Sequence, residues 1–153
     1  DISSLKFYDN VFLNGNDEHL IDIKNQIQKI NPTININQGK YVPLNIEYFN
    51  KELNYLVFSG IGNHRTFVNM LKDNNLRIVD DLEYPDHYQY SKKDFFEIIN
   101  KAKKYGARII TTEKDYLRLD FFNRKEILYI KSTLKILDEK KLEQTLNNLN
   151  EAN

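Results

Sequence analysis

The stretch YLVFSGIGNHRTFVNML, residues 55–71, decides the fold because it joins a short apolar run, a Gly-x-Gly turn and an amphipathic segment. The apolar run has the length of a buried strand. After the turn, Phe67, Val68 and Leu71 recur at the spacing of one helix face. The stretch is therefore predicted to form a strand, a tight turn and a helix.

The same alternation of strand and helix patterns continues along the chain. Strands are expected near 7–13, 33–43, 54–59, 76–82, 107–111 and 126–131. Helices are expected near 17–30, 63–74, 91–105, 113–119 and 138–150. Such alternation is typical of an α/β fold with a mostly parallel sheet and flanking helices. Ser91 and Asp94 have the spacing of a capping box, which predicts where the third helix begins.

The stretch 31–53 divides the chain, because it contains two of the three prolines and a glycine within alternating polarity. We interpret it as a hairpin-like linker. Residues 1–53 are then expected to form the end of an N-terminal lobe and a two-stranded linker. Residues 54–153 are expected to form a C-terminal α/β lobe.

The composition excludes several classes of function. The 22 basic and 22 acidic side chains balance, so a nucleic-acid partner is not expected. The absence of cysteine rules out disulfides, thiolate catalysis and zinc sites built on cysteine. His19, His64 and His87 lack the spacing of metal ligands, so no metal site is expected. No run approaches about 18 apolar residues, which predicts a soluble chain.

The Gly-x-Gly turn lacks the residues of the strong phosphate-binding motifs. A Walker A loop needs a lysine and a hydroxyl that Gly60, Gly62 and Asn63 do not supply. A dinucleotide fingerprint needs a third glycine where Arg65 stands. What remains is a helix N-terminus that tolerates an anion. Both a structural turn and a turn that faces a ligand stay open.

The loop YPDHYQYSKKDF, residues 84–95, follows a predicted strand and precedes a helix. Loops at the carboxyl ends of parallel strands are where α/β proteins place their sites. Asp86 and His87 can project from this loop into a cleft, and a histidine there can hold a carboxylate with one nitrogen and face a ligand with the other. His87 could equally be a residue that only fixes the loop.

The stretch IITTEKDYLRL, residues 109–119, ends a strand and begins a helix. Thr112 is an ordinary N-cap, and Glu113 and Asp115 complement the helix dipole. Lys114 is less ordinary, because the dipole disfavours a cation in a first turn. We therefore expect an anionic group beside it: Glu113, Asp115 or a ligand.

Several short motifs occur together in one order. They are VFLNG at 11–15, YVPLN at 41–45, GIGN at 60–63, PDHYQYS at 85–91 and TTEKD at 111–115. Taken together, they resemble the C-terminal half of the tetraacyldisaccharide 4'-kinases, the lipid A 4'-kinase family. The resemblance covers nearly the whole chain, although no single motif is specific.

The resemblance implies a two-lobe, P-loop-like kinase that transfers the γ-phosphate of ATP to the 4'-hydroxyl of a tetraacyldisaccharide lipid A precursor. ATP and Mg²⁺ would be bound mainly by an N-terminal lobe, since no G-x-x-x-x-G-K-[ST] occurs here. The whole enzyme would lie peripherally on the cytoplasmic face of the bacterial inner membrane, contacting it through that lobe. This chain is expected to be a C-terminal fragment or split product that is inactive alone.

The resemblance also implies roles for individual residues. His87 would pair across the cleft with an aspartate of the missing lobe, orienting it and tuning its charge. Gly60, Gly62, Asn63 and Asp86 would line the cleft. Thr112, Glu113, Lys114 and Asp115 would hold its wall. The family usually reads D-H-H at this loop, and Tyr88 stands at the last position, which leaves His87 as the candidate there.

Two other functions are compatible with the same residues. The chain could be a stand-alone α/β module that binds anions or regulates a partner without kinase activity. It could also be a sugar-modifying enzyme that uses Asp86 and His87 as its own acid and base. The DNA upstream of Asp1 would distinguish the first of these from a kinase.

Overall fold

The computed structural model describes residues 1–15, 17–120 and 124–151, apart from the side chains of 17, 19 and 148–151. The chain forms two compact units. Unit 1 comprises residues 1–42 and 134–153, and unit 2 comprises residues 43–133. The expected division lay between residues 53 and 54, so Pro43–Leu53 group with unit 2 and Leu134 onward groups with unit 1.

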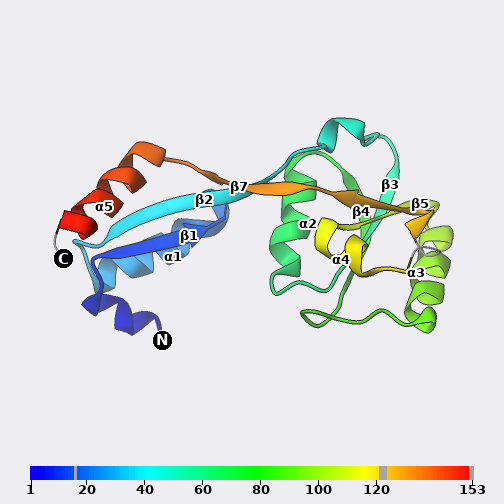
Figure 1. The fold of residues 1–153 in the computed structure, drawn as a ribbon, viewed down its shortest axis with the longest axis horizontal. Helices are drawn as coiled ribbons and strands as arrows, with labels where there is room; N and C mark the ends of the chain where they lie inside the picture. The colour runs from blue at the N-terminus through cyan, green and yellow to red at the C-terminus, as the bar shows by residue number, and fades with distance from the viewer. Residues whose placement is uncertain (16, 121–123, 152–153) are drawn as a thin grey trace. The chain divides into compact units, whose positions relative to one another are not determined.

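Unit 2 contains a four-stranded sheet in the order β4-β3-β5-β6 (Figure 1). β3 pairs in parallel with both β4 and β5, and β5 pairs in parallel with β6. The strands are β3 (Asn54–Ser59), β4 (Arg77–Glu83), β5 (Ala107–Thr112) and β6 (Ile127–Ile130). The helices are α2 (His64–Asp73), α3 (Lys92–Lys104) and α4 (Glu113–Arg118), and a short 3-10 helix, η2 (Ile46–Tyr48), precedes β3.

The core of unit 2 has two sides because β3 is buried on both faces. Tyr55 and Val57 pack with the apolar side chains of α2 on one face. Leu56 and Phe58 pack with those of α3 on the other. The two helices lie on opposite sides of the sheet in Figure 1. This arrangement confirms the predicted α/β fold with a parallel sheet and flanking helices.

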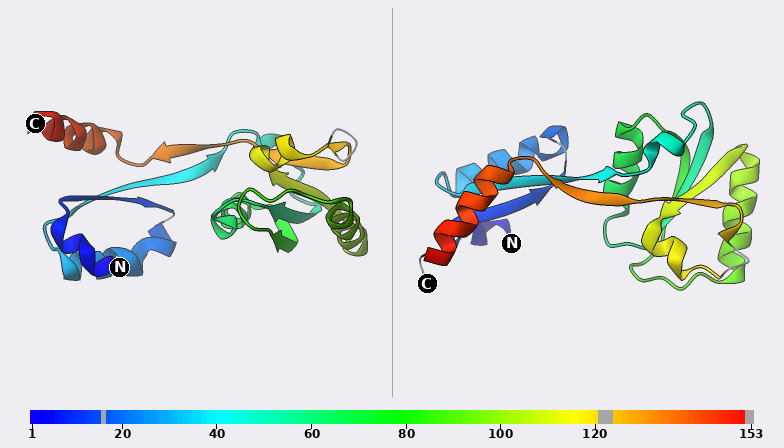
Figure 2. Two further views of the ribbon diagram at one scale, coloured as in Figure 1. Left: turned by 60° about the horizontal axis from the view of Figure 1, so that its bottom comes forward. Right: turned by 45° about the horizontal axis from the view of Figure 1, so that its top comes forward.

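Unit 1 contains a three-stranded sheet in the order β1-β2-β7, together with α1 and α5 (Figure 2). β1 and β2 are parallel. The strands are β1 (Asn10–Asn14), β2 (Asn35–Pro43) and β7 (Ser132–Ile136). The helices are α1 (Asp17–Ile30), α5 (Glu139–Glu151) and the 3-10 helix η1 (Ile2–Phe7). The stretch 31–53 contains only β2 and η2, so no hairpin forms within it.

Candidate functional site

The loops that follow β3, β4 and β5 meet in unit 2. The backbone N–H of Tyr84 donates to the Ser59 carbonyl at 2.9 Å, and that of His87 donates to the Gly60 carbonyl at 3.1 Å. The Arg118 guanidinium, from α4, donates to the same Gly60 carbonyl at 3.3 Å. The structure therefore brings together three of the stretches singled out in the sequence.

Gly60 is the point of closest approach between these loops. A Cβ at this position would lie 3.0 Å from the Pro85 carbonyl oxygen and 3.1 Å from the Tyr90 hydroxyl. Gly62 faces the same loop with more room, since a Cβ there would lie 3.6 Å from the Asp86 carboxylate. The turn is thus a packed corner whose second glycine faces the Asp86 side chain.

His87 stands at the exposed edge of this corner. Its φ of 60° is left-handed, which is uncommon for a residue with a side chain, and the side chain is 79% exposed. Nδ1 lies 3.0 Å from Nη2 of Arg118. An arginine has only donors, so Nδ1 accepts and the neutral ring carries its proton on Nε2. The ring is thereby oriented with a donor left for another group.

Asp86 does not hydrogen-bond to the ring of its neighbour. Its Oδ2 lies 3.8 Å from Nε2 of His87, which is longer than a hydrogen bond. Its Oδ1 instead accepts the backbone N–H of His87 at 3.0 Å. The geometry therefore gives no support to an acid–base pair made of these two side chains alone.

Asp115 is the buried centre of the site. Its side chain is fully buried and accepts hydrogen bonds from the Thr112 hydroxyl at 2.7 Å and the Tyr90 hydroxyl at 3.1 Å. Arg118 lies 3.5 Å away. Burial, and next the charge of Asp115, raise the pKa of the Tyr90 phenol, so that it stays protonated and donates. This network joins the loop after β4 to α4.

Three other predicted residues occupy ordinary positions. Asn63 caps α2 by accepting the N–H of Thr66 at 3.0 Å. Glu113 forms an ion pair with Lys131 at 3.7 Å. Lys114 is exposed, and within the described residues it forms no ion pair with Glu113 or Asp115. Within the described residues Glu113 and Asp115 are paired with Lys131 and Arg118 instead, so of the three expected anionic neighbours of Lys114 the ligand stays open.

A cluster of tyrosines in the loop after β4 was not singled out from the sequence. The rings of Tyr84, Tyr88 and Tyr90 lie with centroids 4.9 to 5.4 Å apart. Burial, with help from the charges of Asp94 and Glu97, raises the pKa of Tyr84 to about 12. The signal was present as three tyrosines within seven residues, YPDHYQY. These rings give the loop a packed base that fixes His87 at its tip.

A buried polar chain beside the Gly-x-Gly turn was also missed. The Ser59 hydroxyl lies 2.7 Å from Nδ1 of His64, and Nε2 of His64 lies 2.8 Å from the Asp81 carboxylate. Ser59 is fully buried, so its hydroxyl is not accessible as a nucleophile. These hydrogen-bonded side chains join β3, α2 and β4 next to the Gly-x-Gly turn.

A search of the described residues finds no group of three or more His, Asp or Glu side chains that could hold a metal ion. The side chain of His19 lies outside the described residues. In the described part of the chain, none of the helices is both long and apolar enough to cross a membrane.

A family model and curated relatives that match this chain carry nearly the same description. The family model described as tetraacyldisaccharide-1-P 4'-kinase matches residues 1–151. A tetraacyldisaccharide 4'-kinase from Pelagibacter ubique is 69% identical over 153 residues, which cover all of this chain and 49% of that protein. One from Rickettsia typhi is 42% identical over 77 residues, covering 50% of this chain and 24% of that protein.

A solved structure also resembles the chain. It is described as the "apo" form of LpxK from Aquifex aeolicus in complex with ATP. The TM-score is 0.42 at 19% identity, and the match covers 91% of this chain and 51% of that one. The chain thus spans about half the length of the Pelagibacter and Aquifex proteins that it matches.

Proposed function

The chain belongs to the tetraacyldisaccharide-1-P 4'-kinase family, and on that premise we propose that it is the C-terminal part of a lipid A 4'-kinase. The whole enzyme transfers the γ-phosphate of ATP to the 4'-hydroxyl of a tetraacyldisaccharide. The observation that carries this proposal is the match of the family model to residues 1–151.

ATP and Mg²⁺ are assigned mainly to an N-terminal lobe. The sequence contains no P-loop lysine and hydroxyl, and the described residues offer no cluster of carboxylates or histidines for a metal ion. Residues of this chain therefore do not fit either group by themselves. Their part is to form one wall of the cleft and to place His87.

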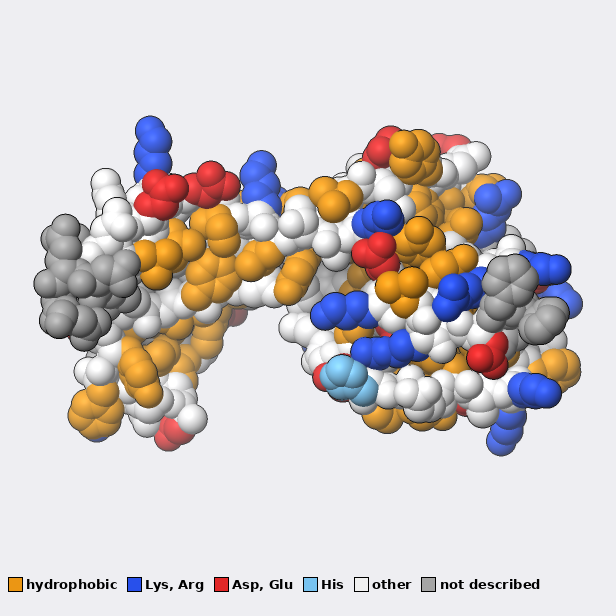
Figure 3. Space-filling model, viewed as in Figure 1, with side chains coloured by type: hydrophobic (Ala, Val, Ile, Leu, Met, Phe, Trp, Pro, Cys, Tyr) orange, Lys and Arg blue, Asp and Glu red, His pale blue; other side chains and the backbone are white. Residues whose placement is uncertain are grey.

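Unit 1 supports the existence of a partner lobe. Both apolar core clusters lie in unit 2, while the described buried apolar side chains of unit 1 are Ile27 and Ile34. Large apolar side chains of unit 1 remain exposed, and they are Phe7, Tyr8, Phe12, Ile21, Tyr41, Leu134, Leu137 and Leu146. Hydrophobic side chains are spread over the visible face of this unit in Figure 3. So much exposed apolar surface is typical of an interaction site.

His87 is the proposed catalytic residue. Because Nδ1 accepts from Arg118, Nε2–H is left as a donor. We propose that it donates to an aspartate of the N-terminal lobe. That hydrogen bond orients the carboxylate and tunes its charge, and the carboxylate accepts the proton of the sugar hydroxyl as that oxygen attacks the γ-phosphate and ADP leaves. Asp86, Gly60 and Gly62 line the cleft beside it. Asn63 lines it too, and Thr112, Glu113, Lys114 and Asp115 hold its wall.

The acylated disaccharide and the N-terminal lobe are the proposed partners, with no nucleic acid. The whole enzyme is proposed to lie peripherally at the cytoplasmic face of the bacterial inner membrane, with the contact made by the N-terminal lobe. The acyl chains of the substrate require such a position, because their apolar surface stays in the bilayer.

A chimera tests the proposal. The N-terminal half of the Pelagibacter ubique kinase is joined to this chain, and transfer of phosphate from ATP to a tetraacyldisaccharide 1-phosphate is measured. We expect transfer by the chimera and none by the chain alone. A folded chimera without activity would overturn the proposal and favour a stand-alone module. Mg-ATP should bind the isolated chain more weakly than about 10 μM, which corresponds to about 7 kcal/mol.

A further inference from the structure

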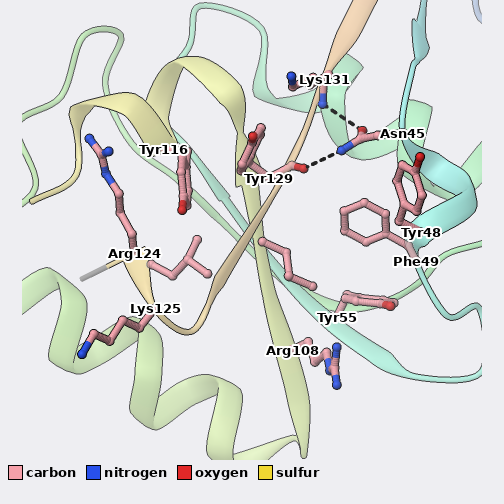
Figure 4. A pocket seen from close by; sticks show the side chains of 12 residues that line it. Asn45, Tyr48, Phe49, Tyr55, Arg108, Tyr116, Arg124, Lys125, Tyr129 and Lys131 are labelled. Carbon is pink, nitrogen blue, oxygen red and sulfur yellow. Dashed lines mark hydrogen bonds between the residues drawn. The ribbon is translucent and has the colours of Figure 1, made fainter. Parts of the chain in front are cut away.

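A hollow lies in unit 2, beside the edge strand β6 (Figure 4). Its volume is about 720 Å³, within the range of small-molecule sites. The lining residues come from η2, β3, β5, α4 and β6 and the segments next to them. The tyrosines and cations among them are Tyr48, Tyr55, Tyr116, Tyr129, Arg108, Arg124, Lys125 and Lys131. None of the candidate cleft residues lines this pocket.

The pocket is positively charged in a chain that is neutral overall. Four cations line it, and no acidic residue is among the described lining residues. Lys131 has a carboxylate nearby, Glu113 at 3.7 Å, with both side chains about half exposed. Within the described part of the chain, Arg108, Arg124 and Lys125 form no ion pair. The surplus charge favours an anionic occupant.

Arg124 is held in position by neutral groups. Its Nε donates to the Leu119 carbonyl at 2.9 Å, and Nη2 donates to the Leu117 carbonyl at 2.8 Å. The guanidinium also lies 5.3 Å from the centre of the Tyr116 ring. A guanidinium has five donors, so three remain for a ligand after these two bonds. It is oriented without being neutralised, which suits the planar recognition of a phosphate.

The tyrosines form a rigid apolar wall beside these charges. The rings of Tyr116 and Tyr129 have centroids 4.3 Å apart at an angle of 31°. Asn45 fixes the strand that carries Tyr129, since its amide donates to the Tyr129 carbonyl at 3.1 Å and accepts from the Lys131 N–H at 3.0 Å. Figure 4 shows Tyr48 and Phe49 on the far side of β6 from Tyr116.

We propose that this pocket binds a soluble organic phosphate, that is, a phosphate ester that carries a ring. The phosphate lies against the Arg124 guanidinium, in the field of the other three lining cations, while the ring lies against Tyr116 and Tyr129. The cations alone would accept any anion, and the adjacent aromatic wall adds the preference for a ring. None of the cleft residues lines the pocket, and the two sites touch through the ion pair between Lys131 and Glu113.

Calorimetry with the 153-residue chain tests the proposal. The probes are glucose 6-phosphate and AMP, with glucose, adenosine and inorganic phosphate as parents that lack either the phosphate or the ring. We expect at least one ester to bind about tenfold or more tighter than each of its parents. Equal binding of the ester and inorganic phosphate, or no binding at all, would overturn the proposal.

Variants locate the binding. Arg124→Gln and Lys125→Gln should each weaken the ester by about tenfold, while Lys72→Gln removes one exposed charge of α2 and should change nothing. Because Arg124 also holds two backbone carbonyls, Lys125→Gln keeps the test valid if the first variant is unstable. NMR shifts on adding the ester should appear at Tyr129 and not at His87, and the reverse pattern would refute the assignment.

Vesicles separate a soluble ligand from a lipid headgroup. Phosphatidylcholine vesicles with and without phosphatidylglycerol are mixed with the chain and sedimented. We expect no sedimentation that depends on Arg124. Sedimentation with the anionic vesicles that is lost in Arg124→Gln, without binding of the soluble esters, would overturn the proposal in favour of a membrane contact.

Discussion

Arg118 reaches across 31 residues of sequence to donate a hydrogen bond from Nη2 to Nδ1 of His87, at 3.0 Å. The same guanidinium holds the Gly60 carbonyl and lies 3.5 Å from the buried Asp115 carboxylate. Arg118 therefore ties the exposed histidine to the buried network of the site. Arg118 was not among the site residues predicted from the sequence.

Replacing Arg118 should lower the activity of the whole enzyme through His87. In Arg118→Met the imidazole loses its partner, and both tautomers and several orientations become accessible. We expect kcat to fall about 10- to 100-fold, with the KM for ATP nearly unchanged, because hydrogen bonds to charged groups contribute about 1.5–3 kcal/mol. Lys72→Met, which removes an exposed charge of α2, is the control. Unchanged kcat in a folded Arg118→Met enzyme would rule out the positioning role.

The two glycines of the turn should differ in tolerance. A Cβ at Gly60 would lie closer to the Pro85 carbonyl and the Tyr90 hydroxyl than an ordinary van der Waals contact. A Cβ at Gly62 would make an ordinary contact with Asp86. Gly60→Ala should cost about 1–3 kcal/mol, which is roughly 2–4 °C of Tm for each kcal/mol. Gly62→Ala should melt close to the unmodified chain. Thermal melts of the two variants side by side decide this, and equal losses would mean that the loop yields.

The buried polar chain should be most sensitive at its centre. His64→Ala leaves the fully buried Ser59 hydroxyl without its partner, which costs about 1–3 kcal/mol besides the cavity. Asp81→Ala should cost less, because the Asp81 side chain is 43% exposed and His64 keeps its bond to Ser59. Urea unfolding of both variants measures the difference. A larger loss in Asp81→Ala would show that the carboxylate anchors the chain.

Most elements of the fold could be predicted from local patterns. The strand of residues 54–59 and the helices whose N-caps are Asn63, Ser91 and Thr112 have their signals within a few residues. β7 was not predicted because only Lys131 separates it from β6, and because the side chains of β7 are mostly exposed. Without burial, a strand leaves little alternation in the sequence.

The candidate site was harder to predict than the fold. The chain order placed the loops of Gly60, His87 and Thr112 at one edge of a sheet, and the structure brings them together. The burial of Asp115 could not be inferred, since an acid in a first turn is usually a surface complement to the dipole. Its partner Tyr90 lies 25 residues away, and local spacing does not report such a pair.

The capping box of α3 should give the stability a dependence on pH. Hydrogen bonds from the Ser91 side chain hold the pKa of the Asp94 carboxyl below its ordinary value, although burial opposes this. The stabilisation is therefore fully present above the unfolded pKa, about 3.9, and is lost as pH falls through the lower folded value. Asp94→Asn should cost about 1 kcal/mol at neutral pH and less at pH 3, which lies below the unfolded pKa of about 3.9. Urea midpoints at both pH values measure this, and a constant difference would contradict it.

His87 itself provides the last test, in the whole enzyme or the chimera. If His87 orients and stabilises a carboxylate of the N-terminal lobe, its interaction is made mainly in the transition state. His87→Ala should then lower kcat by about 10² to 10⁴ and leave the KM for ATP within a few fold. His87→Asn, whose side chain keeps an N–H donor, should recover part of the loss.

A residue that only fixed the loop would behave differently, because its removal would lower the melting temperature and disturb the binding of both substrates. The side chain of His87 is 79% exposed, so its removal should leave the melting temperature nearly unchanged. Near-normal kcat in a well-folded His87→Ala enzyme would refute the catalytic assignment.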